Sequence, residues 1–250
     1  MSETEHGMIR LYQYAPAWGM NVSPFTLKLE TWLKLSNLDY QTIALRTPSQ
    51  SPKGKLPFIQ DEDGTRVADS TLIIDYLKRT RKIDPDHELT ERQRAEAISL
   101  QRLFEEHFYF VLSHSRWIDP LGWATTKSGY FGFLPPGVRD LVSAVVRRQM
   151  RRAQHAQGIG RHSQDDIYAM GRADLRTIAV LLGNRSYFFG DGPTTIDAIA
   201  YGFLANIYFV PIETELKRIA LEFDNLRLYC ERLGQGLGFL SVAAGSGSPQ

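Results

Sequence analysis

The first eighty or so residues combine short alternating stretches with two helical stretches. Alternation of apolar and polar residues predicts strands at 8–14, 40–45, 55–60 and 65–68. Apolar residues recur instead at helical spacing from Ser23 to about Lys34, and again after Asp69 and Ser70. The order strand, helix, three strands and helix predicts an α/β N-terminal part.

Helical periodicity continues through most of the remaining chain. Apolar stripes at helical spacing begin at Leu100, Val138, Leu175, Ile196 and Leu226. The stripe that begins at Ile196 contains almost no polar residue, which predicts a buried, central helix. The chain is therefore expected to be α/β plus all-α.

Changes in composition suggest where these two parts meet. We expect an α/β domain at 8–80 and an all-helical domain at 91–241, joined by a charged linker at 81–90. Pro85 disfavours helix within that linker. Residues 242–250 are rich in glycine, serine and proline, which predicts a disordered tail.

Composition excludes several classes of protein. The 250 residues are 43% hydrophobic and 23% charged, as in soluble globular proteins. A formal net charge of +1 gives no overall attraction to nucleic acid, so we expect no nucleic-acid partner. No apolar run is long enough to be a transmembrane segment, and the polar, acidic start is unlike a signal peptide. The expected location is therefore cytoplasmic.

Cysteine and histidine offer little chemistry. Cys230 is the single cysteine, so an intrachain disulfide is impossible and a reducing compartment fits. It lies in an apolar stripe, which is typical of an inert core thiol. The six histidines show no metal-ligand spacing, and we expect no metal site.

Ser23 is the first candidate functional residue. Serine followed by Pro24 is a typical helix start, with serine as the N-cap and proline at the first helical position. The same hydroxyl stands among free backbone N–H groups at the positive end of the helix dipole. This stretch predicts either a plain cap or a site for an anion, including a thiolate carried by a ligand.

Two further segments have a comparable double interpretation. Leu56-Pro57 opens a strand. It is either a cis proline, with the leucine backbone free to pair with an extended ligand, or an ordinary trans proline. Asp69-Ser70 opens a helix and is either a plain cap or a ligand site. In such a site the Asp69 carboxylate would hold an ammonium group of the ligand, and Ser70 with the helix N-terminus would hold its carboxylate. Thr194 and Asp197 have capping-box spacing, a structural signal.

Two stretches of the helical part remain open in the same way. Residues 147–152 contain four arginines, which form either a solvated helix face or a contact surface for lipid or nucleic acid. Residues 117–133 are rich in aromatic residues and glycine. They either line an apolar pocket or pack against the first domain.

Several motifs together resemble a known family. In the first part they are Ser23-Pro24-Phe25-x-x-Lys28, Lys55-Leu56-Pro57-Phe58 and Ala68-Asp69-Ser70, and in the second Gly190-Asp191-x-Pro193-Thr194-x-x-Asp197. The chain thereby resembles the glutathione transferase superfamily, with a serine-type first helix. Arg116-Trp117, Gly122-Trp123, Phe131-Gly132, 158–163 and Asn225-Leu226-x-x-Tyr229-x-Glu231-Arg232 resemble its failed-axon-connections and metaxin-like branch.

The resemblance implies a thioredoxin-like N-terminal domain, an all-helical C-terminal domain and a homodimer. It implies glutathione as co-substrate and no metal cofactor. Catalysis by Ser23 is implied, with Tyr14 as the alternative, because the loop between them is longer than in compact serine-type enzymes. The implied glutathione-binding residues are Trp18, Ser23, Lys55, Leu56, Pro57, Asp69 and Ser70.

The implied reaction joins the glutathione thiolate to a small hydrophobic electrophile, the second expected partner. The acceptor pocket would be lined by Tyr109, Trp117, Trp123 and Tyr130. Lys28 matches a basic position that is structural. The alternative, which the metaxin-like features allow, is a non-catalytic module that keeps this fold for protein association.

Overall fold

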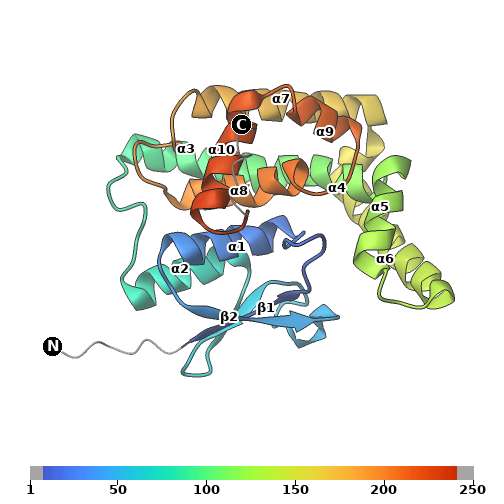
Figure 1. Ribbon diagram of the computed structural model, residues 1–250, viewed down its shortest axis with the longest axis horizontal. Coiled ribbons are helices and arrows are strands. Elements are labelled where there is room, and N and C mark those ends of the chain that lie inside the picture. Colours follow the sequence, from blue (N-terminus) through green and yellow to red (C-terminus); the bar gives the residue numbers. More distant parts are fainter. Residues whose placement is uncertain (1–7, 241–250) are drawn as a thin grey trace, which may run out of the picture.

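Four short strands of the N-terminal part form one sheet with the order β2-β1-β3-β4 (Figure 1). The computed structural model describes residues 8–240, so the predicted tail at 242–250 lies outside the described residues. The strands are β1 Ile9–Tyr14, β2 Tyr40–Leu45, β3 Phe58–Gln60 and β4 Arg66–Ala68. β1 runs parallel to β2 and antiparallel to β3, and β4 is antiparallel to β3. All four predicted strands are present, the third shorter than expected.

Helices α1 (Pro24–Leu35) and α2 (Ser70–Arg81) cover one face of this sheet (Figure 1). Alternate β1 residues Ile9 and Leu11 are buried on that face, against Leu29 and Trp32 of α1. Gln13 follows on the same side and donates its side-chain N–H to Glu30 Oε1 of α1 at 3.1 Å. The side chains between them point to the opposite face of the sheet.

The helical part packs on α1 from the side opposite the sheet (Figure 1). Its helices are α3 Glu91–Arg102, η2 Leu103–Phe108, α4 Tyr109–Trp117, α5 Pro120–Phe131, α6 Pro136–Gln157, α7 Gln164–Leu182, α8 Thr195–Tyr208, α9 Glu215–Ala220 and α10 Asp224–Gly236. Two short 3₁₀ turns lie at Pro48–Gln50 and Ile159–Arg161. Helix α8 is buried from Ile196 to Tyr208, so the predicted central helix is confirmed.

The predicted capping chemistry is also confirmed. Asp197 is fully buried and accepts hydrogen bonds from the backbone N–H of Thr194 and of Phe188, at 2.8 and 3.1 Å. The Tyr229 hydroxyl donates to it as well, at 3.0 Å. Cys230 is buried, and burial raises the pKa of its thiol well above the ordinary value, as expected of an inert core residue. Among the helices of residues 8–240, none has the length and apolarity needed to cross a membrane.

Two features of the helical part differ from what the apolar pattern suggests. The stripe from Leu100 to Leu112 spans α3, α4 and, between them, the π-helical turn η2. In α6, the stripe from Val138 to Val145 faces solvent rather than a core. Both differences depend on how neighbouring helices pack, which the spacing of apolar residues does not encode.

Close contact between α1 and α8 requires Gly202. A Cβ atom at this position would lie 2.6 Å from the Pro24 carbonyl oxygen and 2.6 Å from the Lys28 backbone nitrogen. We expect Gly202→Ala to lower the free energy of unfolding by about 1–3 kcal/mol, because the two helices must move apart. Urea unfolding measures this, with Gly236→Ala as the control, since a Cβ there meets no atom within 4 Å. Equal stability of the two variants would contradict this close packing.

Candidate functional site

Three segments of the N-terminal part meet at one edge of the sheet. Tyr12 of β1 pairs with Phe58 of β3, and Phe58 pairs with Ala68 of β4. Continuing this antiparallel register brings the end of β1, the Leu56-Pro57 segment and the Asp69-Ser70 segment together. The chain also leaves β1 at this edge and re-enters the fold at the start of α1. The candidate residues of these segments therefore lie toward the same end of the sheet.

Ser23 is half-buried and serves as the N-cap of α1. Its hydroxyl oxygen accepts a hydrogen bond from the Thr26 backbone N–H at 3.4 Å. Its own backbone N–H donates to Asn21 Oδ1 at 3.0 Å. Within residues 8–240 the Ser23 hydroxyl donates to no acceptor, so its proton is available to an anion at the helix N-terminus.

The segment before Ser23 is held by a buried arginine and a buried asparagine of the helical part. Arg116 of α4 donates to the Val22 carbonyl oxygen at 2.6 Å and to Asn206 Oδ1 at 2.8 Å. Asn206 of α8 donates in turn to the Asn21 carbonyl oxygen at 3.2 Å. The register of Ser23 is therefore set by the other domain. Only the polar Asn206 within an apolar stripe could have signalled this from the sequence.

The Leu56-Pro57 segment offers its backbone to the region. The peptide bond between the two residues is cis. Pro57 is buried, Leu56 half-buried and the preceding Lys55 exposed. No backbone hydrogen bond of Leu56 is formed within the described part of the chain. Its N–H and C=O are thus available to pair with an extended ligand.

Asp69 caps α2, and Ser70 is its first residue. Asp69 Oδ1 accepts from the Thr71 and Leu72 backbone N–H groups at 3.0 and 3.3 Å. Its φ of +87° lies in a region that non-glycine residues rarely adopt, and strained residues of this kind cluster at functional sites. The buried Ser70 hydroxyl makes no hydrogen bond with residues 8–240. A cap and a ligand site are therefore compatible here.

Tyr14 lies on a different side of the sheet from Ser23. Gln13 points toward α1, so its neighbour Tyr14 points to the face that α1 does not cover. The Tyr14 side chain is 40% exposed, and partial burial raises the pKa of its hydroxyl. Of the two candidate activators of a thiol, Ser23 alone lies at the α1 terminus.

Aromatic side chains of the helical part lie beside the loop that precedes α1. The Trp18 indole lies against the backbone of Gly129 and 5.8 Å from the Tyr130 ring, measured between ring centroids. Trp117 lies 5.7 Å from Tyr130 and 5.9 Å from Trp123. Three of the four predicted acceptor-pocket residues thus form one cluster with Trp18.

The fourth predicted acceptor residue, Tyr109, stands apart from that cluster. Its ring packs edge-on against Phe25 of α1, with 5.0 Å between the centroids. On the side of the cluster, Arg116 donates to the Tyr130 hydroxyl at 2.9 Å. Burial raises the pKa of Tyr109, so its hydroxyl stays protonated at neutral pH.

Behind the α2 terminus lies a buried ion pair that joins the two domains. Lys28 of α1 is completely buried and lies 2.6 Å from Glu105 Oε1 in η2. Its ammonium also donates to Thr71 Oγ1 at 2.8 Å, and Gln101 donates to Glu105 Oε2 at 3.0 Å. Burial lowers the pKa of Lys28, and the Glu105 carboxylate opposes that shift. This agrees with the expected structural role of Lys28.

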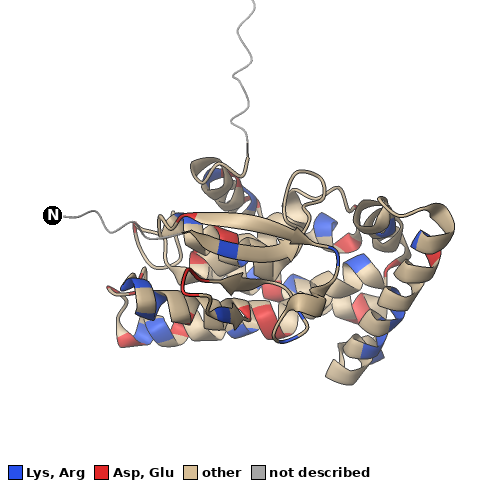
Figure 2. Ribbon diagram, turned by 90° about the horizontal axis from the view of Figure 1, so that it is seen from below, with Lys and Arg blue, Asp and Glu red and all other residues tan. Residues whose placement is uncertain are grey.

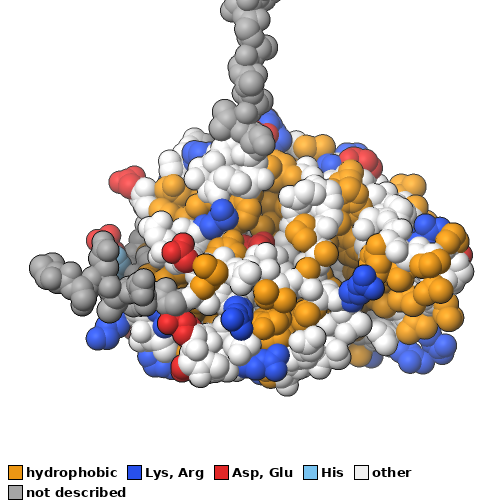
Figure 3. All heavy atoms as spheres, turned by 60° about the horizontal axis from the view of Figure 1, so that its bottom comes forward, with side chains coloured by type: hydrophobic (Ala, Val, Ile, Leu, Met, Phe, Trp, Pro, Cys, Tyr) orange, Lys and Arg blue, Asp and Glu red, His pale blue; other side chains and the backbone are white. Residues whose placement is uncertain are grey.

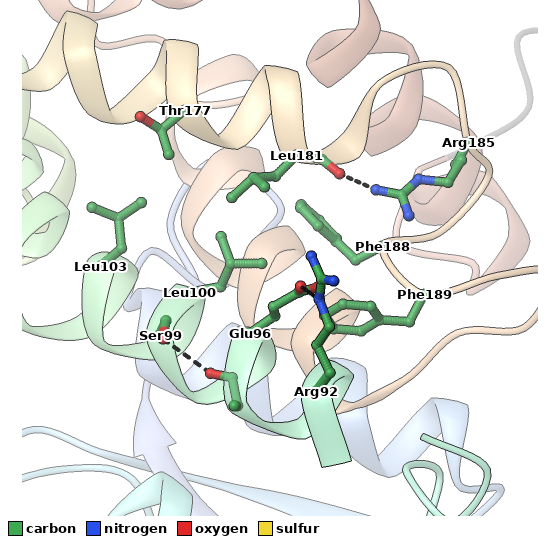
Figure 4. A pocket seen from close by; sticks show the side chains of 11 residues that line it. Arg92, Glu96, Ser99, Leu100, Leu103, Thr177, Leu181, Arg185, Phe188 and Phe189 are labelled. Carbon is green, nitrogen blue, oxygen red and sulfur yellow. Dashed lines mark hydrogen bonds and ion pairs between the residues drawn. The ribbon is translucent and has the colours of Figure 1, made fainter. Parts of the chain in front are cut away.

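A cavity of the described chain lies elsewhere, between α3, α7 and residues 185–189 (Figure 4). It has a volume of about 350 Å³ and a mostly apolar lining that includes Leu100, Leu103, Leu181, Phe188 and Phe189. None of the predicted site residues contributes to it. Within residues 8–240, no three His, Cys, Asp or Glu side chains are grouped to hold a metal ion.

Sequence comparison gives the family of the chain. The family description "Glutathione S-transferase N-terminal domain" matches residues 24–122, and "Glutathione S-transferase, C-terminal domain" matches residues 171–233. Isoprene-epoxide--glutathione S-transferase of Rhodococcus sp. (strain AD45) is 35% identical over 236 residues, which cover 90% of this chain and 98% of that protein. The chain belongs to the glutathione S-transferase family.

Two further proteins that resemble this chain are longer. Failed axon connections of Drosophila melanogaster is 31% identical over 82% of this chain, and human Metaxin-1 is 26% identical over 90%. The chain spans about half of each, 51% and 50%. The predicted resemblance to the glutathione transferases, and to this branch of them, is confirmed.

Solved structures confirm the predicted fold class of this glutathione S-transferase. Glutathione transferase GSTFuA3 of Phanerochaete chrysosporium superposes with a TM-score of 0.65, at 18% identity, over 96% of this chain and all of that one. A glutathione S-transferase of Ceriporiopsis subvermispora, solved in complex with glutathione, gives a TM-score of 0.62 at 20% identity. The fold is a thioredoxin-like domain followed by an all-helical domain.

Proposed function

We propose that this glutathione S-transferase binds glutathione and joins its thiolate to a small hydrophobic electrophile. The observation that carries the proposal is the free hydroxyl proton of Ser23 at the α1 terminus, taken together with the unpaired Leu56 backbone and the Asp69-Ser70 cap. The name of the Rhodococcus relative, which pairs an epoxide with glutathione, supports an electrophile of this kind.

Each part of the tripeptide has a matching group. The cysteinyl backbone pairs with Leu56 in the manner of a β-strand, next to Pro57. Ser70 and the α2 terminus take the γ-glutamyl carboxylate, and the Asp69 carboxylate takes the ammonium group. Lys55, which precedes Leu56, is exposed and is the partner of the glycyl carboxylate.

The chemistry requires the thiolate form of glutathione. The thiol loses its proton to solvent, and the Ser23 hydroxyl donates to the sulfur and stabilises its negative charge. The sulfur then forms a bond to an electrophilic carbon, whose bond to the leaving group breaks. Trp18, Trp117 and Tyr130 supply the apolar wall against which the electrophile lies, and Trp123 extends it.

Binding of glutathione is the first test. We expect calorimetric titration with glutathione to give a saturable heat, and Ser70→Ala to weaken the affinity by about tenfold because a bond to a carboxylate is lost. The Ser70 hydroxyl has no partner within residues 8–240, so the melting temperature should not change. Ser99→Ala on α3 is the matched control. Absence of any heat at millimolar glutathione would contradict the proposal and favour a non-catalytic module.

The oligomeric state and the cellular location of the protein are further expectations. The homodimer and the cytoplasmic location stay predictions that rest on the family resemblance and the composition. The alternative function, a module for protein association, predicts the same caps and turns without bound glutathione. The binding measurement therefore distinguishes the two functions directly.

A further inference from the structure

Helices α5 and α6 form a hairpin that projects from the body of the molecule (Figure 1). Helix α6 has 22 residues, of which only Ser143 and Gln154 are buried. Arg147, on the same inward side, donates to the carbonyl oxygens of Trp117 and Ile118 at 2.7 and 3.0 Å. These contacts fix which face of α6 is turned outward. They also reduce the predicted basic patch from four arginines to three, because the Arg147 side chain packs against α4 rather than facing outward.

The N-terminal half of the outward face is apolar. Val138, Leu141, Val142 and Val145 follow each other at helical spacing and are 50%, 69%, 37% and 51% exposed. In the space-filling view, hydrophobic side chains and Lys or Arg side chains lie side by side at the right-hand end, where the hairpin lies (Figure 3). A stripe of four exposed aliphatic side chains is more than the scattered apolar residues of an ordinary surface.

The C-terminal half of the same face is basic. Arg148 and Arg152 lie three and seven residues beyond Val145 and therefore continue its stripe, with Arg151 beside them. None of these three arginines forms an ion pair or a side-chain hydrogen bond within residues 8–240. Charges of both signs are mixed over the sheet side of the molecule (Figure 2), whereas the Asp, Glu, Lys and Arg residues of α6 are five arginines and one aspartate.

We propose that the outward face of α6 docks on a membrane surface that contains anionic lipids. The aliphatic half enters the boundary between head groups and acyl chains, and the guanidinium groups of Arg148, Arg151 and Arg152 lie at the lipid phosphates. An anionic bilayer complements both halves of this face. Its acyl boundary accepts the aliphatic side chains, and its phosphates attract the unpaired arginines. The helix lies on the bilayer and does not cross it.

A second copy of the chain fits this face less well. In a twofold contact between antiparallel α6 helices, Arg148 and Arg152 would be placed against the aliphatic half of the partner helix. Their charges would lose water without gaining a carboxylate, which is costly. Asp140, the sole acidic residue of α6, already pairs with Lys127 at 2.8 Å. Charge complementarity therefore favours an anionic bilayer over self-association.

Flotation with lipid vesicles tests the proposal. We expect the full chain to float with phosphatidylcholine vesicles that contain about 30 mol% phosphatidylglycerol, to float poorly with pure phosphatidylcholine, and to detach as salt is raised. The double variant Leu141→Glu, Val145→Glu and the double variant Arg148→Gln, Arg152→Gln should each weaken binding by about tenfold or more. All four side chains are exposed, so folding should be retained, which circular dichroism checks.

Matched controls separate this face from the rest of the surface. Leu228→Glu on α10, which is 51% exposed, and Arg176→Gln on α7 change similar side chains elsewhere and should leave flotation unchanged. Failure of the full chain to float with anionic vesicles would overturn the proposal, as would equal losses in the controls. A dimer that Leu141→Glu, Val145→Glu converts to a monomer in sedimentation would instead assign the face to a second copy.

Discussion

Replacing Ser23 by alanine is expected to lower the rate of glutathione conjugation by about a hundredfold or more while most of the affinity for glutathione remains. The hydroxyl contacts the reacting sulfur, whereas Leu56, Asp69 and Ser70 hold the rest of the tripeptide. Without this donor, the pKa of the bound thiol should rise toward its ordinary value of about 8.5. Ultraviolet absorbance of the thiolate as a function of pH, together with steady-state rates with chlorodinitrobenzene, measures both effects.

Two variants distinguish this role from that of a helix cap. Ser23→Thr keeps a hydroxyl at the cap and should retain much of the activity, whereas loss of the cap alone costs about 1 kcal/mol of stability. Tyr14→Phe removes the hydroxyl of the alternative residue and should leave the thiol pKa unchanged. Loss of activity in Tyr14→Phe together with an active Ser23→Ala would reverse the assignment.

Removing one partner of the buried Lys28–Glu105 pair is expected to have the largest effect on stability. Glu105→Ala leaves a fully buried ammonium without its carboxylate, and we expect a loss of about 3–5 kcal/mol in the free energy of unfolding. The double variant Lys28→Met, Glu105→Leu removes both charges and should recover most of that loss. Guanidinium unfolding of Lys28→Met, of Glu105→Leu and of the double variant completes the cycle.

The control for this cycle is an exposed ion pair on α3. Arg92 and Glu96 lie 2.9 Å apart, with side chains 89% and 45% exposed. Glu96→Ala should change the stability little, since solvent already screens the pair. A loss in Glu105→Ala no larger than that in Glu96→Ala would show that burial does not set the strength of the Lys28 contact.

Local chemistry made much of the fold predictable. The alternation in β1, the serine and proline at the start of α1 and the capping box at Thr194 are properties of neighbouring residues. They specify strands and helix ends before any tertiary contact is considered. The candidate ligand residues lie at those same ends, because strand termini and helix N-termini carry the free backbone groups that a ligand uses.

Features that depend on contacts between distant segments were not predictable. The π-helical turn η2 lies inside a continuous apolar stripe, and no residue of that stripe marks the change of hydrogen bonding. Arg116 holds Val22 across 94 positions of sequence. In α6 the apolar stripe indicates a helix correctly but does not reveal that the stripe faces outward, because that depends on where Arg147 and Ser143 pack.

The position of α1 between the sheet and α8 has a consequence for biosynthesis. The side of α1 that meets α8 is covered only after residues 36–208 have been made. At about 5–20 residues per second, this takes roughly ten to thirty seconds. During that interval the nascent N-terminal half exposes the apolar surface around Phe25 and Leu27. A chaperone that binds apolar helices would meet this chain on the ribosome at that stage of synthesis.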